Sequence, residues 1–403
     1  MKKFNFYTFS TVLIAVVILM INACTQNESV EQQHHAFNAT PYEIPDVTYF
    51  PKNLNIPEDN PMTVEGITLG RYLFYDGRLS GRTNPDSLMS CATCHIQENG
   101  FECGIDNPRF SGGQTFGLTG KPTPHYMLPI VNLVYNQNGY FWNGFINKEN
   151  PYKGSAAYGV PSEEQYNFKN IESVVWMTIT APHEMNGSID RTVKTISDID
   201  MYPQMFNAAF GTEKITYDRI SKAIAQYIRS IISYRSKFHK SLRHEAELST
   251  SEKRGHDLFF SEDADCFHCH GGSVLMTTNQ YFNNAKDNVF NDKMDRYSLT
   301  GDPMDMGAYR APSLINVELT APYMHDGRFA TLDEVIDFYS TGLVYSDFVH
   351  PLMKAVRYRG VQLSNQDKND LKAFLLTLTD KELILDPAYA CPTELEAWSG
   401  QSK

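Results

Sequence analysis

The sequence predicts a mostly α-helical fold built from two similar domains. A Cys-x-x-Cys-His run occurs twice, at residues 91–95 and 266–270. Each run follows a Gly-x-x-Leu-Phe segment whose apolar residues recur at helical spacing, and strand-like alternation is sparse along the chain. With 403 residues, the chain is long enough for two domains of ordinary size. We therefore expect a duplicated helical module, with one Cys-x-x-Cys-His run in each copy.

The repeated run is the attachment signature of a c-type haem. Its two thiols form thioethers with the haem vinyl groups, and the His that follows ligates the iron. The composition predicts about 0.004 chance occurrences of this pattern per chain. A redox dithiol needs no His after it, and a four-cysteine zinc site would have to join two distant pairs. We therefore expect two cytochrome c-like domains, each with one covalent haem c; the motif residues are Cys91, Cys94 and His95 in the first copy and Cys266, Cys269 and His270 in the second.

The N-terminus predicts export. Two lysines precede the apolar run 12–21, and small residues lead to Cys24, which resembles the lipidated cysteine of a bacterial lipoprotein. The alternative is a membrane anchor that is never cleaved, but the run is short for a spanning helix. We expect a periplasmic protein that is lipid-anchored to a bacterial membrane through Cys24.

The domain boundaries follow from composition and periodicity. Apolar residues recur at helical spacing in three segments: 67–75, 217–233 and a final helix at 367–379. The polar stretch 237–253 is typical of a linker. The predicted segments are a signal peptide at 1–23, a tether at 24–60, an N-terminal haem domain at 61–245, a C-terminal haem domain at 246–385 and a tail at 386–403.

The net charge and the two remaining cysteines say little about which molecules the protein binds. The net charge of −12 argues against nucleic acid and suits a basic or locally basic electron donor. Cys103 and Cys391 are left over; they either pair in the oxidising compartment or remain two separate buried thiols.

From about Gly66 to Thr379 the chain resembles the bacterial diheme cytochrome c peroxidases and the related MauG-type enzymes. The resemblance rests on an ordered series of landmarks: Leu73 to Ser80, the first haem motif, Phe141 to Gly144, Glu184-Met185, the second haem motif, Ala311 to Val317 and Leu319 to Gly327. It implies a peroxidatic first haem and an electron-transfer second haem.

The resemblance makes His95 the proximal ligand of the peroxide site. Peroxidases that need prior reduction carry a capping His about twenty residues later, but this chain has no His between His95 and His125 and a Gly-rich loop instead. An open, five-coordinate first iron is implied, with capping by His125 as the alternative. Glu184 matches the catalytic Glu that moves a proton during peroxide cleavage, a task that suits a carboxylate beside an apolar haem face. Its neighbour His183 is a second candidate proton carrier.

At the second haem, the resemblance implies Tyr339 as the other axial ligand, where the peroxidases have Met and MauG has Tyr. Phenolate favours oxidised iron. In the alternative, Met324 or Met353 ligates the iron and Tyr339 is an aromatic residue of the core. Trp142 matches the family Trp that lies between the haems and relays electrons.

The resemblance also implies a calcium ion between the domains, bound by backbone carbonyls of Thr320 and Pro322, since oxygen ligands suit this hard cation. The position at which the family has Asn holds Tyr126, with Asn132 as a substitute.

These observations predict a peroxidase that reduces hydrogen peroxide with electrons from a small exported cytochrome c or cupredoxin. Two alternatives remain open: a MauG-like diheme oxidase that modifies a partner protein, and a non-catalytic electron-transfer or haem-sensing lipoprotein.

Overall fold

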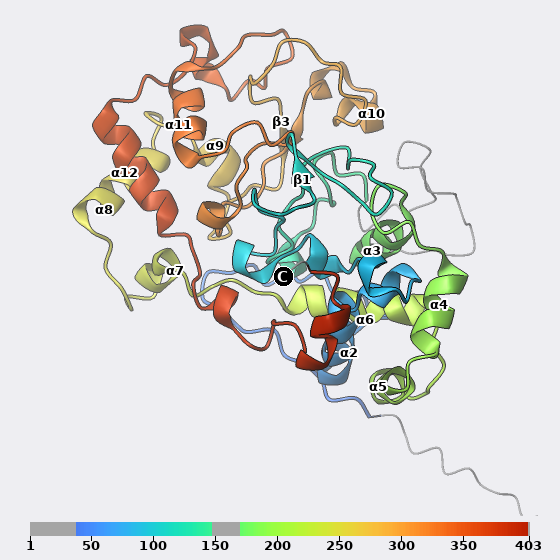
Figure 1. The fold of residues 1–403 in the computed structure, drawn as a ribbon. Helices are drawn as coiled ribbons and strands as arrows, with labels where there is room; N and C mark the ends of the chain where they lie inside the picture. Colours follow the sequence, from blue (N-terminus) through green and yellow to red (C-terminus); the bar gives the residue numbers. More distant parts are fainter. Residues whose placement is uncertain (1–37, 147–169, 402–403) are drawn as a thin grey trace, which may run out of the picture. The chain divides into compact units, whose positions relative to one another are not determined.

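Helices dominate the computed structural model, which describes residues 38–146 and 170–401 (Figure 1). The mostly helical fold that the sequence predicts is confirmed. The α-helices of the described residues are α2 (Val64–Tyr75), α3 (Asn170–Thr180), α4 (Ile189–Ser197), α5 (Met201–Phe210), α6 (Tyr217–Ser230), α7 (Lys237–Leu242), α8 (Thr250–Phe259), α9 (Phe267–His270), α10 (Tyr297–Thr300), α11 (Leu332–Thr341) and α12 (Asn365–Leu376). The predicted signal peptide and Cys24 lie outside these residues. Within them, no helix has the length and apolar character needed to cross a membrane.

The first hydrophobic core forms where α2 packs on α6. The Thr63 side chain caps α2 by accepting a hydrogen bond from the Gly66 N–H. Leu69, Leu73 and Phe74 are fully buried on the inner face of this helix. Gly70 lies directly against the Ala223 carbonyl, and a Cβ there would overlap that oxygen. Glycine therefore lets the two helices approach closely.

The second core repeats this arrangement with α8 and α12, which lie side by side (Figure 1). Gly255 of α8 lies against the Asp370 backbone, as Gly70 of α2 lies against Ala223. Phe259 and Phe374 are buried in this core. The Gly-x-x-Leu-Phe repeat in the sequence thus corresponds to a repeated helix pair.

The predicted linker at 237–253 contains more helix than its polar composition suggested. Ser236 caps α7 by accepting from the His239 N–H, and Ser249 forms a capping box with Glu252 at the start of α8. Local capping therefore stabilises two short helical segments in a stretch that has no continuous apolar face.

Two small two-stranded antiparallel sheets complete the described fold. β1 (Phe110–Ser111) pairs with β2 (Gln114–Thr115), and β3 (Tyr281–Phe282) pairs with β4 (Tyr309–Arg310). The C-terminal segment returns to the first core, where Tyr75 Oη donates to the Tyr389 carbonyl at 2.7 Å and Arg71 Nε donates to the Ala390 carbonyl at 2.7 Å.

Candidate active site

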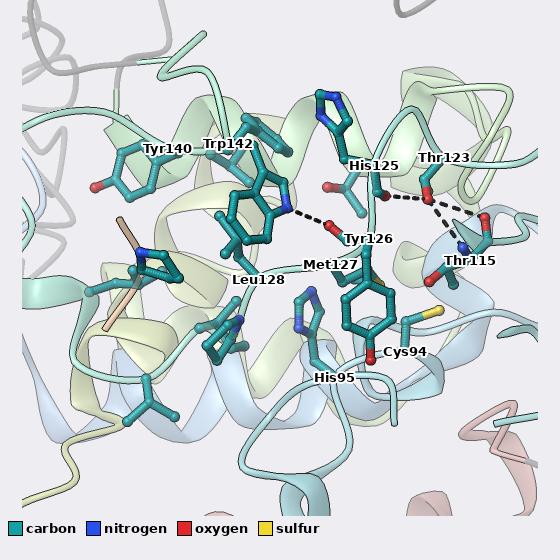
Figure 2. A pocket seen from close by; sticks show the side chains of 18 of the residues that line it. Cys94, His95, Thr115, Thr123, His125, Tyr126, Met127, Leu128, Tyr140 and Trp142 are labelled. Atoms are coloured by element: carbon teal, nitrogen blue, oxygen red, sulfur yellow. Dashed lines mark hydrogen bonds between the residues drawn. The ribbon is translucent and has the colours of Figure 1, made fainter. Parts of the chain in front are cut away.

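The first haem motif borders a cavity, part of which is drawn in Figure 2. Cys91, Cys94 and His95 line its wall. His95 Nδ1 lies 2.9 Å from the Phe101 carbonyl oxygen. Burial lowers the pKa of His95 to about 4, so the ring is neutral and Nδ1 carries the proton that it donates to this carbonyl. The other ring nitrogen, Nε2, is then the lone-pair atom available for iron.

The second motif has the same local geometry at a second cavity. Cys266, Cys269 and His270 line it, and His270 Nδ1 lies 3.0 Å from the Pro312 carbonyl oxygen. Burial lowers the pKa of His270 to about 4 as well. Both motif histidines are therefore neutral and held by a backbone carbonyl in the tautomer that metal ligation requires.

A buried arginine between the cavities provides an independent test of whether haem fits. Arg310 lines both cavities and is 8% exposed. Its guanidinium donates to oxygens of Gly139, Asn136 and Asn279, which are all neutral, and no ion pair to it is present among the described residues. A buried cation without an anion is costly. Haem propionates would supply that anion, so the residues fit the haem groups that the two motifs imply. Arg310 could not be identified from the sequence, because only the fold reveals that it faces both cavities.

Glu184 lies in the wall of the first cavity, on the turn that follows α3. This turn is fixed by its backbone: the Glu184 N–H donates to the Ala181 carbonyl at 3.0 Å, and the Leu118 N–H donates to the Glu184 carbonyl at 2.8 Å. The Glu184 side chain is 16% exposed. Burial raises its pKa to about 7, against a smaller opposite effect of a hydrogen bond with Thr178. A carboxyl group with this pKa can both accept and return a proton near neutral pH.

His183 lies beside Glu184, with 4.0 Å between His183 Nε2 and Glu184 Oε1. It lines the same cavity. Burial lowers the pKa of His183 to about 4, so its ring is neutral at neutral pH. The structure thus brings both predicted proton carriers to the cavity.

His125 also lines the first cavity, but its ring is engaged elsewhere. Its Nε2 lies 2.6 Å from Asp292 Oδ2, and the rings of His125 and His95 lie apart in Figure 2. This contact gives His125 a partner other than an iron above His95.

Three candidate ligands for the second iron line the second cavity: Tyr339, Met324 and Met353. Asn284 Nδ2 donates to Tyr339 Oη at 3.0 Å and lies 3.7 Å from Met324 Sδ. Burial raises the pKa of Tyr339, so the phenol is protonated without a metal. The choice among the three stays a prediction.

Trp142 lines both cavities and is 8% exposed. Its indole Nε1 donates to the Tyr126 carbonyl at 2.7 Å, the contact drawn in Figure 2. This hydrogen bond fixes the indole in the wall that the two cavities share.

Neither Tyr126 nor Asn132 offers the side-chain oxygen expected for a calcium ion near Thr320, whereas the buried Glu102 carboxyl group lines the same cavity as Thr320 and Pro322. Tyr126 Oη is already used: it accepts from the Gly104 N–H at 3.1 Å and lies 3.2 Å from the Ala321 carbonyl. The Asn132 side-chain amide donates to the Ser233 carbonyl and accepts from the Ser233 N–H. Neither side chain fits a calcium ligand, and binding by the Thr320 and Pro322 carbonyls stays a prediction.

Cys103 and Cys391 are both free thiols, so the pairing that the sequence left open is not formed. Cys103 is fully buried, and a hydrogen bond with the Cys94 thiol lowers the pKa of the Cys103 thiol. Cys391 lies with the C-terminal segment on the first core.

Comparison with known proteins shows which family this chain resembles. The family model of the di-haem cytochrome c peroxidases matches residues 64–247. The chain is 30% identical over 331 residues to the methylamine utilization protein MauG of Methylorubrum extorquens, covering 81% of this chain and 82% of MauG. It is 29% identical over 373 residues to the cytochrome-c peroxidase IdrP1 of Pseudomonas sp., covering 85% and 88%.

Two solved structures also resemble this chain. A MauG-like protein associated with microbial copper homeostasis matches with a TM-score of 0.71 and 33% identity, over 88% of this chain and 99% of that one. The diheme peroxidase BthA from Burkholderia thailandensis has the same fold, with a TM-score of 0.61 at 18% identity over 91% and 99%. The chain therefore belongs to the di-haem cytochrome c peroxidase and MauG family of oxidoreductases.

Proposed function

We propose that this protein is a di-haem c-type peroxidase that reduces hydrogen peroxide to water with electrons from a small exported cytochrome c or cupredoxin. One observation carries the proposal: Glu184, with a pKa of about 7, lies in the wall of the cavity that holds the first haem motif. Similarity to proteins named cytochrome-c peroxidases supports the same reaction.

Cys91 and Cys94 would hold the first haem c covalently, and His95 would ligate its iron through Nε2. The corresponding residues of the second motif would hold the second haem. When bound, the first haem supplies the redox-active iron at which the peroxide O–O bond breaks.

Glu184 would move the proton that this cleavage requires. Its carboxylate accepts the proton of one peroxide oxygen and delivers it to the other, which leaves as water. A pKa near neutrality suits both halves of the transfer, because a carboxylate of ordinary acidity would be a weaker base and would take the peroxide proton less readily. The neutral ring of His183 beside it can act as a hydrogen-bond partner during the transfer.

Trp142 would carry electrons between the two cavities, since its indole borders both. Tyr339 is the ligand that we propose for the second iron opposite His270, where an anionic oxygen favours the oxidised state. The Asn284 amide that donates to its hydroxyl oxygen would stabilise the phenolate.

We also propose that the protein is exported and lipid-anchored. The support is the sequence alone: a basic start, an apolar run and Cys24. The acidic net charge of −12 suits a donor protein with a basic docking face.

The experiment is a stoichiometry measurement with purified holoprotein, hydrogen peroxide and a reduced small cytochrome c or a reduced cupredoxin. Reduction of one peroxide to two waters takes two electrons, so two donor molecules should be oxidised for each peroxide consumed. Glu184→Gln should abolish this turnover while leaving both haems attached. Peroxide loss without donor oxidation would refute the assignment.

A MauG-like oxidase is the second candidate, favoured by the position of Tyr339 in the second cavity and by similarity to MauG and to a MauG-like protein. The two candidates differ in their reductant. The oxidase predicts that a specific partner protein is covalently modified when peroxide is added, whereas the peroxidase predicts only oxidised donor.

A further inference from the structure

A series of ring contacts leads away from Trp142 through His325 to Tyr309. The Tyr309 and His325 rings are stacked, with centroids 3.5 Å apart and planes at 18°. The His325 ring meets the Trp142 indole edge-to-face, with centroids 6.2 Å apart. The backbones are linked as well, because the Arg310 N–H donates to the Trp142 carbonyl at 2.7 Å. Tyr309 is therefore connected to the wall between the cavities through one intervening ring.

The Tyr309 phenol has a proton acceptor in place. Its hydroxyl donates to Asp292 Oδ2 at 2.5 Å, and the same oxygen lies 2.6 Å from His125 Nε2. The Met294 N–H donates to Asp292 Oδ1 at 2.8 Å. Partial burial raises the pKa of Asp292, but the hydrogen bond and charge of His125 outweigh this effect and leave the pKa below its usual range. The carboxylate is thus ionised at neutral pH and directed at the phenol.

The two stacked rings also reach toward solvent. Tyr309 and His325 line the second cavity and also a smaller cavity of about 60 Å³. The wall of this smaller cavity includes Val289, which is 67% exposed, and Asn291, which is exposed. Asp292 itself is 30% exposed. The stack thus runs from the shared wall of the haem cavities to a partly exposed carboxylate.

We propose that Tyr309 is a redox-active tyrosine that passes single electrons from a donor protein docked beside Asp292 to the oxidised haem pair. The inference rests on the proposed function, which supplies the oxidant as peroxide-oxidised haem. In the forward step, one electron leaves Tyr309 through His325 and Trp142, the phenol O–H bond breaks, and the proton passes to Asp292 Oδ2. The products are a neutral tyrosyl radical and a protonated Asp292. One electron from the reduced donor, with return of the proton from Asp292, restores the phenol.

Tyr323, another partly buried tyrosine, lacks this arrangement and provides a control. Tyr323 lines the second cavity too, but its hydroxyl donates to the Val317 carbonyl at 2.9 Å, which cannot accept a proton. Oxidation of Tyr323 would leave a charged radical at a partly buried site, which is unfavourable.

Two buried tyrosines also reach a carboxyl group but differ from Tyr309. Tyr126 Oη lies 3.4 Å from Glu102, whose pKa is raised well above its usual range by burial, so this carboxyl group holds its own proton at neutral pH. Tyr202 donates to Asp76 but is not among the residues that line the two haem cavities. Tyr309 thus combines an ionised carboxylate partner with a place in the wall of the second cavity.

The test is electron paramagnetic resonance of freeze-quenched holoprotein after one equivalent of hydrogen peroxide, with no donor present. Wild type grown on ring-deuterated tyrosine should give a tyrosyl signal with altered hyperfine structure. Tyr309→Phe should remove this signal and slow oxidation of the reduced donor about tenfold or more. Asp292→Asn, which keeps the shape but takes no proton, should also remove the signal, and Tyr323→Phe should retain it.

The outcomes separate the relay from the peroxidase. If the haem absorption changes with peroxide but no tyrosyl signal forms, or if the signal persists in Tyr309→Phe, the relay is refuted and the peroxidase stands. If the haems of wild type do not react with peroxide, the proposed function fails and the relay fails with it.

Discussion

Replacing Glu184 by glutamine should slow the reaction with peroxide and, at neutral pH and above, stabilise the fold. The unfolded chain loses the Glu184 proton near pH 4.5, whereas burial raises the pKa in the folded chain to about 7. Across this interval the unfolded state binds fewer protons than the folded state. The free energy of unfolding therefore falls by about 1.4 kcal/mol per pH unit, or about 3 kcal/mol in total, and the loss is complete above pH 7.

Glutamine has no proton to lose and avoids this cost. Glu184→Gln should thus be more stable than wild type by about 3 kcal/mol near pH 8, and by less than about 1 kcal/mol near pH 5. Its rate of reaction with peroxide should fall by on the order of 10²–10⁴-fold, because the amide cannot accept the proton. In wild type, this rate should rise with pH to a plateau above about pH 7, as the carboxylate forms.

Guanidinium unfolding of the holoprotein at both pH values measures the stability, and stopped-flow absorption measures the peroxide reaction. Glu213→Gln, at an exposed position, is the matched control and should change neither quantity. An equal stability difference at both pH values would show that Glu184 is not desolvated. An unchanged peroxide rate would remove it from the mechanism.

Three further predictions concern the haem sites. Cys94→Ala should lower the haem content measured by pyridine haemochrome from two to one per chain, whereas Cys391→Ser should keep two; full haem content in Cys94→Ala would contradict the attachment. Tyr339→Phe should raise the reduction potential of the second haem and change its ligand spectrum, whereas Met324→Leu should leave both unchanged; the reverse pattern would make Met324 the ligand. Arg310→Met removes a buried positive charge beside both cavities, so spectroelectrochemical titration should show lower potentials, by on the order of 60 mV or about 1.4 kcal/mol; unchanged potentials would place the propionates elsewhere.

Features that are local in sequence could be predicted well. The haem motifs carry their chemistry within five residues, and the structure adds only the carbonyl that orients each His. The first helix was predicted at 67–75 and runs over Val64–Tyr75. Its apolar spacing marks its inner face, and Gly70 falls where α6 approaches.

Features that join distant segments could not be predicted. Arg310 ends the short strand β4 and resembles any other arginine in the sequence, because nothing local indicates that it faces two cavities. His125, Asp292 and Tyr309 come from three separate loops or strands, and only the fold brings them together. The helical start of the predicted linker depended on the Ser236 cap, which composition alone does not reveal.

We propose above all that the first cavity holds a haem whose distal side is open to peroxide. Absorption and electron paramagnetic resonance spectra of the diferric holoprotein, before and after stoichiometric peroxide, test it most directly. Because the His125 ring is engaged with Asp292, we predict one high-spin ferric haem whose signal is lost at once on addition of peroxide, without prior reduction. Two low-spin haems that do not react with peroxide until one electron has been added would contradict this account.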